Sequence, residues 1–309
     1  MSTALVTGAA GFIGSHLVEG LLDRGYRVRG LDNCSTGSRE TLAGLDGDGA
    51  FTFIEGDVRD SEVVARAMEG VESVFHLAAY TSVPGSFERA GYVSAVNCTG
   101  TATVLEVAAE ADVESVVLAS SAAVYGSDVP VRVSESVTPA PASPYASSKL
   151  YGEQLGAQFV DEFGLDVVAL RFFNVYGPRQ DPDGEYAAVV PKFIELLVSR
   201  ERPVIFGDGE QTRDFVFVED VVRACVAAVE SGESGVFNVG RGERVSVNEL
   251  VEQLNDVVGT DVDPIYAEPR PGDVRHSGAD VSKARDTFGF EAGVELGTGL
   301  EATVEYFEG

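Results

Sequence analysis

The sequence predicts an α/β fold in which a doubly wound parallel sheet carries a smaller C-terminal α/β lobe. Three observations lead to this prediction. Short apolar segments alternate with amphipathic helical patterns through the first 170 residues, as repeated βα units do. A glycine-rich turn at residues 7–14 joins the first expected strand to the first expected helix. Beyond residue 171 the pattern is more broken, and glycine and proline turns between short segments indicate a second lobe.

Each element of the large domain follows from a local side-chain pattern. Buried strands of a parallel sheet are continuous apolar runs, and the helices that cover it repeat apolar residues every three or four positions. We therefore expect strands at residues 3–7, 27–31, 51–55, 73–77, 114–119 and 166–170, and helices at 12–24, 60–69, 91–110 and 144–163. Residues 122–143 are rich in Pro, Ser and Val without a helical period, which indicates a loop over the site.

The C-terminal lobe is expected to contain helices at residues 187–199, 218–230, 246–258, 280–287 and 298–307. The predicted boundary lies near residue 170. Residues 1–170 then form the large domain and residues 171–309 mainly the smaller lobe, while segments near 215–240 return to the large sheet.

Length and composition limit the class of protein. A chain of 309 residues that is 44% hydrophobic can bury a large core. No apolar run approaches the roughly 20 residues that span a bilayer, so we expect a soluble, cytoplasmic protein. Cys34, Cys98 and Cys225 lie far apart and indicate free thiols in a reducing compartment. The three histidines are equally scattered, so no metal site is predicted.

The net charge is the unusual part of the composition. The formal charge is −28 at pH 7, and only three of the 22 basic residues are lysines. Self-repulsion of this size disfavours a compact state in dilute buffer, whereas molar salt shortens the Debye length to about 3 Å and removes most of the repulsion. We predict adaptation to a high-salt cytoplasm, the alternative being an ordinary acidic enzyme. Nucleic acid is excluded as a partner.

The glycine turn is the first functional motif. Gly8, Gly11 and Gly14 have the spacing G-x-x-G-x-x-G and directly follow the first apolar strand. Glycines at this junction allow a tight turn, the approach of a pyrophosphate to the backbone, and phosphate contact with the N-terminal amides of the helix. The motif indicates a dinucleotide site of the short-chain dehydrogenase type. The alternative is a turn without a ligand, because a chain with 35 glycines produces some spacings by accident.

Residues at the next strand ends point to the kind of dinucleotide. Asp32 ends the second strand about 20 residues after the turn, where a carboxylate accepts both ribose hydroxyls and repels a 2′-phosphate. This favours NAD over NADP, unless Asp32 is a solvated loop residue. Asp57 follows the third strand and could reach the adenine edge. Residues 76–79 end the fourth strand with small side chains, as a backbone beside a cofactor requires.

Tyr145 and Lys149 are the candidate catalytic pair. Residues four apart on a helix share a face, so the phenol and the ammonium point into the same space. A nearby ammonium should lower the tyrosine pKa from its usual value of about 10 and so produce a general base. Ser121 ends the fifth strand 24 residues earlier and is placed to hydrogen-bond the reacting hydroxyl. The alternative is two surface residues on a solvated helix face.

Together these motifs resemble the extended short-chain dehydrogenase/reductase superfamily. Residues 121–126 (Ser-Ala-Ala-Val-Tyr-Gly) and 171–178 (Arg-Phe-Phe-Asn-Val-Tyr-Gly-Pro) add to the resemblance. Within the superfamily the chain most resembles NAD-dependent nucleotide-sugar epimerases of the UDP-glucose 4-epimerase group, over nearly its whole length. The resemblance implies a Rossmann-type NAD-binding domain and a nucleotide-sugar-binding lobe. It also implies that Ser121, Tyr145 and Lys149 are catalytic.

The same resemblance implies the residues that contact each ligand. For NAD these are Gly8, Gly11, Phe12, Ile13, Gly14, Asp32, Asn33, Ser35, Gly37, Asp57, Val58, Leu77, Ala78, Ala79, Asn97, Tyr145, Lys149 and Phe172. For a UDP-sugar substrate they are Thr81, Ser121, Asn174, Val190, Phe206, Arg213, Arg270, Asp273 and Ser277.

Two segments of the smaller lobe carry the substrate resemblance. Residues 206–215 resemble the uridine-and-phosphate segment of these epimerases, with Arg213 on the diphosphate. Residues 270–277 resemble the second clamp, with Arg270 on a phosphate and Asp273 near the ribose. A protein with a charge of −28 cannot attract a dianion by its overall field, so binding must rely on local, bidentate arginines. A surface ion pair remains the alternative for either arginine.

One residue bears on the size of the sugar. Glucose-only epimerases tend to place a bulky aromatic beside the sugar C2, and the corresponding residue here is Ser277. A small side chain leaves room for an N-acetyl group, unless the surrounding backbone shifts and refills the space.

Differences from neighbouring families favour epimerisation. Sugar 4,6-dehydratases carry Asp-Glu after the catalytic hydroxyl residue, and UDP-glucuronate decarboxylases keep the glutamate, whereas Ala122 and Ala123 stand here. We therefore expect a UDP-hexose 4-epimerase of galactose metabolism that forms a transient 4-keto sugar with tightly bound NAD. The alternatives are a UDP-glucuronate 4-epimerase, a reductase, or a non-catalytic NAD-binding sensor. By resemblance, helices 91–110 and 144–163 should form a four-helix homodimer interface.

Overall fold

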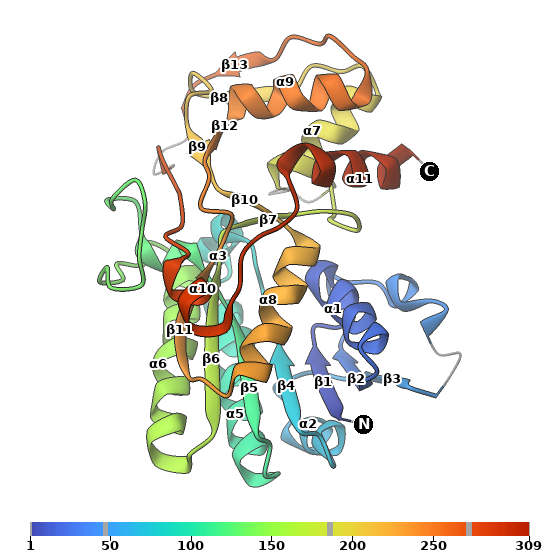
Figure 1. Ribbon diagram of the computed structural model, residues 1–309, viewed down its shortest axis with the longest axis vertical. Coiled ribbons are helices and arrows are strands. Elements are labelled where there is room, and N and C mark those ends of the chain that lie inside the picture. Colours follow the sequence, from blue (N-terminus) through green and yellow to red (C-terminus); the bar gives the residue numbers. More distant parts are fainter. Residues whose placement is uncertain (1, 46–48, 184–187, 270–273, 309) are drawn as a thin grey trace.

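A parallel sheet of seven strands is the central feature of the computed structural model, which describes residues 2–45, 49–183, 188–269 and 274–308 (Figure 1). The strands are β1 (Thr3–Thr7), β2 (Arg27–Asp32), β3 (Phe51–Glu55), β4 (Ser73–His76), β5 (Ser115–Ser121), β6 (Asp166–Phe172) and β11 (Gly235–Val239). Their order across the sheet is β11-β6-β5-β4-β1-β2-β3. The predicted doubly wound α/β fold is confirmed.

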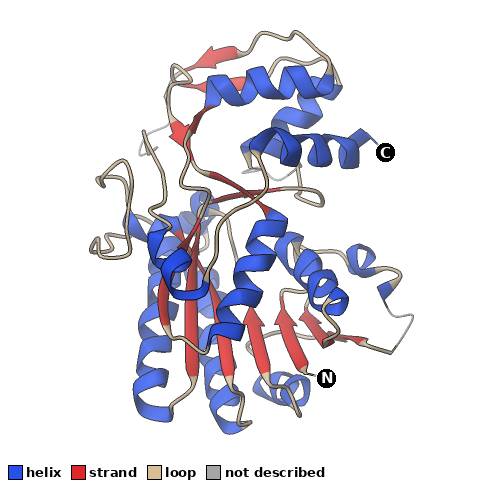
Figure 2. Ribbon diagram, viewed as in Figure 1, coloured by secondary structure: helices blue, strands red, loops and turns tan. Residues whose placement is uncertain are grey.

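Helices cover both faces of this sheet (Figures 1 and 2). One face packs against α1 (Phe12–Asp23), α8 (Val218–Ser231) and α10 (Ser282–Phe288), and the other against α2 (Ser61–Met68), α5 (Gly100–Glu110) and α6 (Pro144–Phe163). Along β1, Ala4 and Val6 belong to the first of these cores and Leu5 to the second. Alternate residues of a strand point to opposite faces, so a strand buried on both sides needs the continuous apolar run from which it was predicted.

The smaller lobe lies beyond the carboxyl ends of the strands (Figure 1). Its core is formed by α7 (Val189–Val198), α9 (Val247–Val258) and α11 (Leu296–Glu308). Short strand pairs flank these helices: β8 (Val204–Phe206) with β13 (Ile265–Ala267), and β9 (Thr212–Arg213) with β12 (Val245–Ser246). A third pair, β7 (Asn174–Tyr176) with β10 (Phe215–Phe217), connects the lobe to the sheet.

The structure adds detail that the apolar patterns did not predict. The expected helix at 91–110 consists of α4 (Ala90–Val93), the π-helical turn η3 (Ser94–Thr99) and then α5. The short helix α3 (Val83–Glu88) and the 3₁₀ turns η1 (Arg39–Leu42) and η4 (Ala122–Tyr125) were not predicted. Elements of one or two turns are too short to show an apolar period. The π-helical turn has one extra residue, which hardly disturbs the apolar pattern of the longer helix around it.

Within the described ranges, no helix has both the length and the apolar character needed to cross a membrane. The same part of the chain brings together no group of three or more His, Cys, Asp or Glu side chains that could hold a metal ion.

Candidate active site

The carboxyl ends of the strands gather the predicted motifs at one edge of the sheet. β1 pairs with β2 on one side and with β4 on the other, so the direction of strand order reverses between β1 and β4. Open parallel sheets bind ligands in the crevice at such a switch point. The glycine turn follows β1 and Ser121 ends β5, so both lie at this edge.

The glycine turn has the geometry of a phosphate cradle. Gly8 has φ +71°, and a Cβ built on it would lie 2.7 Å from the backbone nitrogen of Ala78. A Cβ on Gly14 would collide with the Gly8 carbonyl oxygen. Gly11 precedes the first turn of α1 without any side-chain cap, so the amides of Phe12 and Ile13 lie at a helix N-terminus suited to an anion. These residues fit a dinucleotide.

Asp32 lies beside this turn and is bonded to it. Its Oδ2 accepts the Ala10 N–H at 2.9 Å and its Oδ1 accepts the Cys34 N–H at 2.8 Å. Gly37 packs so closely on the Ala10 backbone that a Cβ there would overlap it. The carboxylate therefore holds the loop after β2 against the glycine turn, and its contact with the ribose stays a prediction.

Asp57 forms an ion pair and hydrogen bonds that the sequence did not predict. Arg59 donates to it through Nε at 2.8 Å and Nη2 at 2.7 Å, and Asn33 Nδ2 donates at 2.9 Å. The hydrogen bonds from Arg59 hold the pKa of Asp57 well below its ordinary value. Asn33 in turn accepts the Ser35 N–H at 3.1 Å, so the predicted adenosine-side residues form one bonded surface.

The segment after β4 runs beside the glycine turn, where its backbone packs against Gly8. Leu77, Ala78 and Ala79 are half-buried, and the Ala78 N–H donates to Thr7 Oγ1 at 3.2 Å. The Thr7 hydroxyl also lies 2.8 Å from Nδ1 of the buried His76. Burial lowers the pKa of His76 to about 3, so its ring is neutral at pH 7.

Asn97, predicted to contact NAD, lies in the π-helical turn and is buried. Its Oδ1 accepts the Tyr80 N–H at 2.8 Å, and its Nδ2 donates to the Tyr80 carbonyl at 3.0 Å and to Ser148 Oγ at 2.9 Å. The amide is thus engaged by protein groups and joins the loop after β4 to α6.

Ser121, Tyr145 and Lys149 meet at the end of β5. The Tyr145 hydroxyl is hydrogen-bonded to Ser121. Lys149 Nζ donates to the Ala119 carbonyl oxygen at 2.7 Å and lies 5.8 Å from the centroid of the Tyr145 ring. Helical spacing brings the phenol and the ammonium to one face, and the strand end supplies the hydroxyl.

The electrostatics of this trio differ from the prediction. Burial raises the pKa of Tyr145 above its ordinary value, and the hydrogen bond from Ser121 offsets only part of that rise. Burial also lowers the pKa of Lys149 to about 8. The expected depression of the tyrosine pKa by the lysine is therefore wrong for this structure. Desolvation of the phenolate outweighs an ammonium that bonds to the Ala119 carbonyl instead of the phenol.

A buried ion pair behind the trio was not predicted. Glu153, one turn after Lys149, accepts Arg171 Nε at 2.8 Å and Nη2 at 2.6 Å, and it also accepts the Ser120 hydroxyl. Both charged side chains are only 4% exposed, and the guanidinium lies 4.6 Å from the centroid of the Tyr125 ring. The Tyr145–Lys149–Glu153 spacing on one helix was an available signal, but the arginine partner is on another element.

The two predicted substrate segments lie side by side. The Thr212 N–H donates to the Arg275 carbonyl at 3.0 Å, and the Ser277 N–H donates to the Thr212 carbonyl at 3.1 Å. Arg213 follows Thr212 on β9 and is half-buried. Arg270 and Asp273 lie outside the described residues.

The remaining predicted substrate residues are more scattered. Thr81 is exposed after β4, and Phe206 ends β8. The Asn174 N–H donates to the Asp214 carbonyl at 2.9 Å, which attaches β7 to the end of β9.

Three predicted contact residues turn out to belong to the hydrophobic cores. Val58 and Phe172 are 5% and 7% exposed and pack under the sheet faces, and Val190 is 1% exposed inside the smaller lobe. Each side chain packs against other apolar residues, and the predicted contacts of these three residues stay predictions.

The chain matches a known family and its members over nearly its whole length. The profile of the "NAD dependent epimerase/dehydratase family" matches residues 4–240. The "UDP-glucose 4-epimerase" of Mycolicibacterium smegmatis is 42% identical over 306 residues, which cover 98% of this chain and 97% of that protein.

Two solved structures have closely similar folds. The UDP-N-acetylglucosamine 4-epimerase of Methanobrevibacter ruminantium, in complex with UDP-N-acetylmuramic acid, has a TM-score of 0.96 and is 39% identical, covering 99% of this chain and 98% of that one. The UDP-glucose 4-epimerase of Thermus thermophilus, in complex with NAD, has a TM-score of 0.90 and is 38% identical, covering 99% of both chains.

Proposed function

The chain belongs to the NAD-dependent epimerase/dehydratase family, and from this we propose that it is an NAD-dependent UDP-hexose 4-epimerase. The observation that carries the proposal is the meeting of Ser121, Tyr145 and Lys149 beside a glycine turn that fits a dinucleotide. The substrates proposed are UDP-glucose and UDP-galactose, together with the corresponding N-acetylhexosamine pair. This range is supported by two similar proteins, one named a UDP-glucose 4-epimerase and the other a UDP-N-acetylglucosamine 4-epimerase.

The chain's own residues supply the acid–base part of the reaction. Bound NAD, held by the glycine turn and Asp32, supplies a reversible hydride acceptor at the sugar C4. Tyr145 removes the proton from the 4-hydroxyl and later returns it to the same oxygen, after the transient 4-keto sugar has turned its opposite face toward the nicotinamide. Ser121 hydrogen-bonds the oxygen as charge develops on it. Lys149, whose ammonium bonds the Ala119 carbonyl and not the phenol in this structure, would hold the cofactor ribose.

The absence of a second acid at the reacting centre favours epimerisation over dehydration. Positions 122 and 123 are alanines in the 3₁₀ turn that follows Ser121, so they cannot protonate a leaving hydroxyl. Ser277 lies on the segment paired with Thr212, and its small side chain supports the inclusion of N-acetylhexosamines.

The decisive experiment is proton NMR of the sugar anomeric region with no added cofactor. UDP-glucose, UDP-N-acetylglucosamine and UDP-glucuronate would be offered separately in molar KCl. We expect the galacto epimer to appear from the first two, because an epimerase regenerates and retains its NAD in each turnover. If folded, NAD-loaded protein converts none of these sugars, the assignment fails. Conversion of UDP-glucuronate alone would identify the protein as a UDP-glucuronate 4-epimerase instead.

The protein is proposed to act as a homodimer through α6 and the helices beside it. Tyr151 and Phe163 on α6 are 39% and 61% exposed, and Val83 and Phe87 on neighbouring α3 are 39% and 63% exposed. Aromatic side chains on such a surface are typical of interfaces. Light scattering after size exclusion should give twice the chain mass, and Tyr151→Asp should reduce it, whereas Tyr306→Asp on α11 should not. A monomeric wild-type protein would exclude the dimer.

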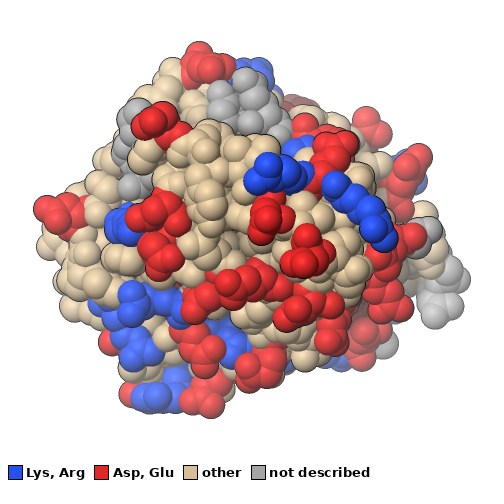
Figure 3. Space-filling view, turned by 90° about the horizontal axis from the view of Figure 1, so that it is seen from above, with Lys and Arg blue, Asp and Glu red and all other residues tan. Residues whose placement is uncertain are grey.

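Adaptation to high salt and a cytoplasmic location are also proposed. Figure 3 shows acidic side chains spread across one whole face of the molecule, with smaller groups of basic side chains among them. The unpaired Cys34, Cys98 and Cys225 fit a reducing compartment.

Salt should therefore stabilise the fold. Raising KCl from about 0.1 M to about 3 M should raise Tm by at least roughly 4 °C, the shift that about 1–2 kcal/mol gives in a chain of this size. Differential scanning calorimetry measures it, and sucrose at matched osmolality is the control because it does not screen charge. Equal stabilisation by KCl and sucrose would contradict adaptation to high salt and would favour an ordinary acidic enzyme.

A further inference from the structure

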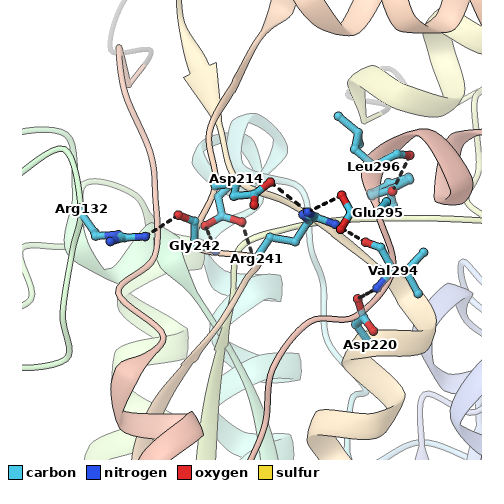
Figure 4. Close-up of polar contacts among 10 residues, drawn as sticks. Arg132, Asp214, Asp220, Arg241, Gly242, Val294, Glu295 and Leu296 are labelled. Atoms are coloured by element: carbon cyan, nitrogen blue, oxygen red, sulfur yellow. Dashed lines mark hydrogen bonds and ion pairs between the residues drawn. The ribbon is translucent and has the colours of Figure 1, made fainter.

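Asp214 is a buried carboxylate at the junction between the substrate segments and the sheet. It stands between β9 and β10 and has no solvent exposure. Its Oδ1 accepts the Arg241 N–H at 2.7 Å, and its Oδ2 accepts the N–H groups of Gly242 at 3.0 Å and Ala279 at 2.9 Å. Figure 4 shows Asp214 facing the turn at Arg241 and Gly242. One side chain thus joins segments that are far apart in sequence.

The joined segments are the one that carries Arg213, predicted to contact the diphosphate, and the described end of the second predicted substrate segment. Arg213 directly precedes Asp214, and Ala279 comes two residues after Ser277. Thr212 exchanges backbone hydrogen bonds with residues 275 and 277 at 3.0 and 3.1 Å. The separation of Arg213 from the second segment is therefore set by these backbone bonds and by the Asp214 carboxylate.

The turn after β11 is packed directly against this carboxylate. A Cβ at Gly240 would lie 3.0 Å from both carboxylate oxygens of Asp214. On its outer side, the Arg241 guanidinium pairs with Glu243 at 2.9 Å. It also pairs with Glu295 at 3.0 Å (Figure 4). The turn is therefore held from both sides, and a shift at Asp214 would be transmitted to the segment at Ala279.

The charge at this position reduces the stability of the fold. Burial raises the pKa of Asp214 from 3.8 to about 6, despite the three N–H groups and the charge of Arg241, which lower it. Because the folded pKa exceeds the unfolded one, the folded chain binds the proton more tightly between these values. The stability contributed by this group is therefore lost as the pH rises through that window to neutrality. A stable fold alone does not call for an ionised group here.

We infer that Asp214 is a positioning residue, whose ionised carboxylate holds Arg213 and residues 275–277 at the separation that the UDP-sugar requires. The inference rests on the proposed function, which supplies the UDP-sugar. Asp214 has no solvent exposure and bonds only backbone N–H groups, so it acts through the backbone of the joined segments. Protonation, or replacement by asparagine, removes the charge that draws the three N–H groups together.

Several charged or titratable groups lie on the elements around Asp214, and the pH experiment has to separate them. Histidine changes charge between pH 5 and 8, and His276 Nδ1 lies 3.0 Å from Thr212 Oγ1. The charged and titratable side chains on these elements are Arg132, Arg213, Arg241, Glu243, Arg244, Arg275, His276 and Asp280.

The test compares Asp214→Asn with a matched variant, Asp220→Asn. Asp220 is equally unexposed and accepts the N–H groups of Gly293 at 3.2 Å and Val294 at 3.1 Å, but it lies on α8 outside the substrate segments. Calorimetry would titrate UDP-glucose into the NAD-loaded proteins. Asp214→Asn should raise Kd at least about tenfold at neutral pH, and Asp220→Asn should leave Kd within about twofold of wild type.

The pH dependence of Kd is the readout that a purely structural role would not change. Both phosphates of UDP-glucose are esterified, so the ligand itself does not titrate in the range used. As the pH falls through about 6, wild type and Asp220→Asn should lose affinity, whereas Asp214→Asn should show no such loss.

Equal Kd values for the two asparagine variants, or one pH profile shared by all three proteins, would overturn the inference while leaving the proposed function intact. Failure of wild type to bind UDP-glucose would overturn both. Should Asp214→Asn not fold, the comparison is between wild type and His276→Gln. A loss of affinity near pH 6 that persists in His276→Gln supports Asp214. If wild type loses no affinity near pH 6, or if His276→Gln abolishes that loss, the inference about Asp214 is refuted.

Discussion

Replacing Tyr145 by phenylalanine is expected to lower kcat by about 10²–10⁴-fold, the contribution of a positioned general acid–base group. The substitution keeps the ring and removes only the hydroxyl that bonds Ser121. The protein should therefore fold, retain NAD and bind the UDP-sugar with little change in KM. The anomeric proton NMR assay measures turnover, and absorbance of the denatured supernatant measures the retained cofactor.

The control for this variant is Tyr306→Phe, which removes a hydroxyl from a 50% exposed side chain on α11, far along the chain from the site. It should keep wild-type kcat. If Tyr145→Phe also kept wild-type kcat, Tyr145 would not be the general base. If it raised KM and left kcat unchanged, its role would be binding alone.

Replacing Glu153 by glutamine is expected to cost about 3–5 kcal/mol of unfolding free energy, because it leaves the buried Arg171 cation without its counter-charge. The two side chains are each 4% exposed, and their bidentate contact at 2.6 and 2.8 Å is their only charged pairing in the described structure. Urea denaturation in molar KCl, followed by circular dichroism, measures the change. High salt should restore little of the loss, since buried charges are poorly screened.

Two further variants separate charge burial from general damage. Glu195→Gln breaks a surface ion pair with Lys192. The Glu195 side chain is 38% exposed and that of Lys192 is 44% exposed, so the change should alter stability very little. The double change Glu153→Leu with Arg171→Met removes both buried charges and should recover much of the loss. A Glu153→Gln protein as stable as Glu195→Gln would show that the buried pair is not needed for the fold.

Patterns that depend on neighbouring residues in the chain predicted the fold. The apolar runs placed the six predicted strands of the sheet to within two residues. The inner strands β1, β4, β5 and β6 are buried nearly throughout, so each is a continuous apolar segment that stands out from its polar flanks. The family resemblance, NAD as the cofactor and the doubly wound fold are confirmed. The 3₁₀ and π-helical turns were missed because they carry no period of their own.

The candidate site was predictable wherever one strand end or one helix face carries it. Gly8 and Gly14 leave no room for a side chain, and the spacing of Tyr145 and Lys149 puts them on one face of α6. The roles of these residues in catalysis and binding stay predictions. Val58, which the family resemblance places among the NAD contacts, has its side chain in the core, since a sequence position does not state which way a side chain points.

By itself the sequence determined the parallel sheet, the tight glycine turn and the grouping of Ser121, Tyr145 and Lys149, because local spacing and the common edge of parallel strands suffice for these. Only the tertiary structure decided the charge state of that site. The raised pKa of Tyr145, the pairing of Glu153 with Arg171 and the three N–H groups around Asp214 all come from segments distant in the chain. Desolvation and long-range hydrogen bonds depend on which groups exclude water from one another, and that is known only after the chain has folded.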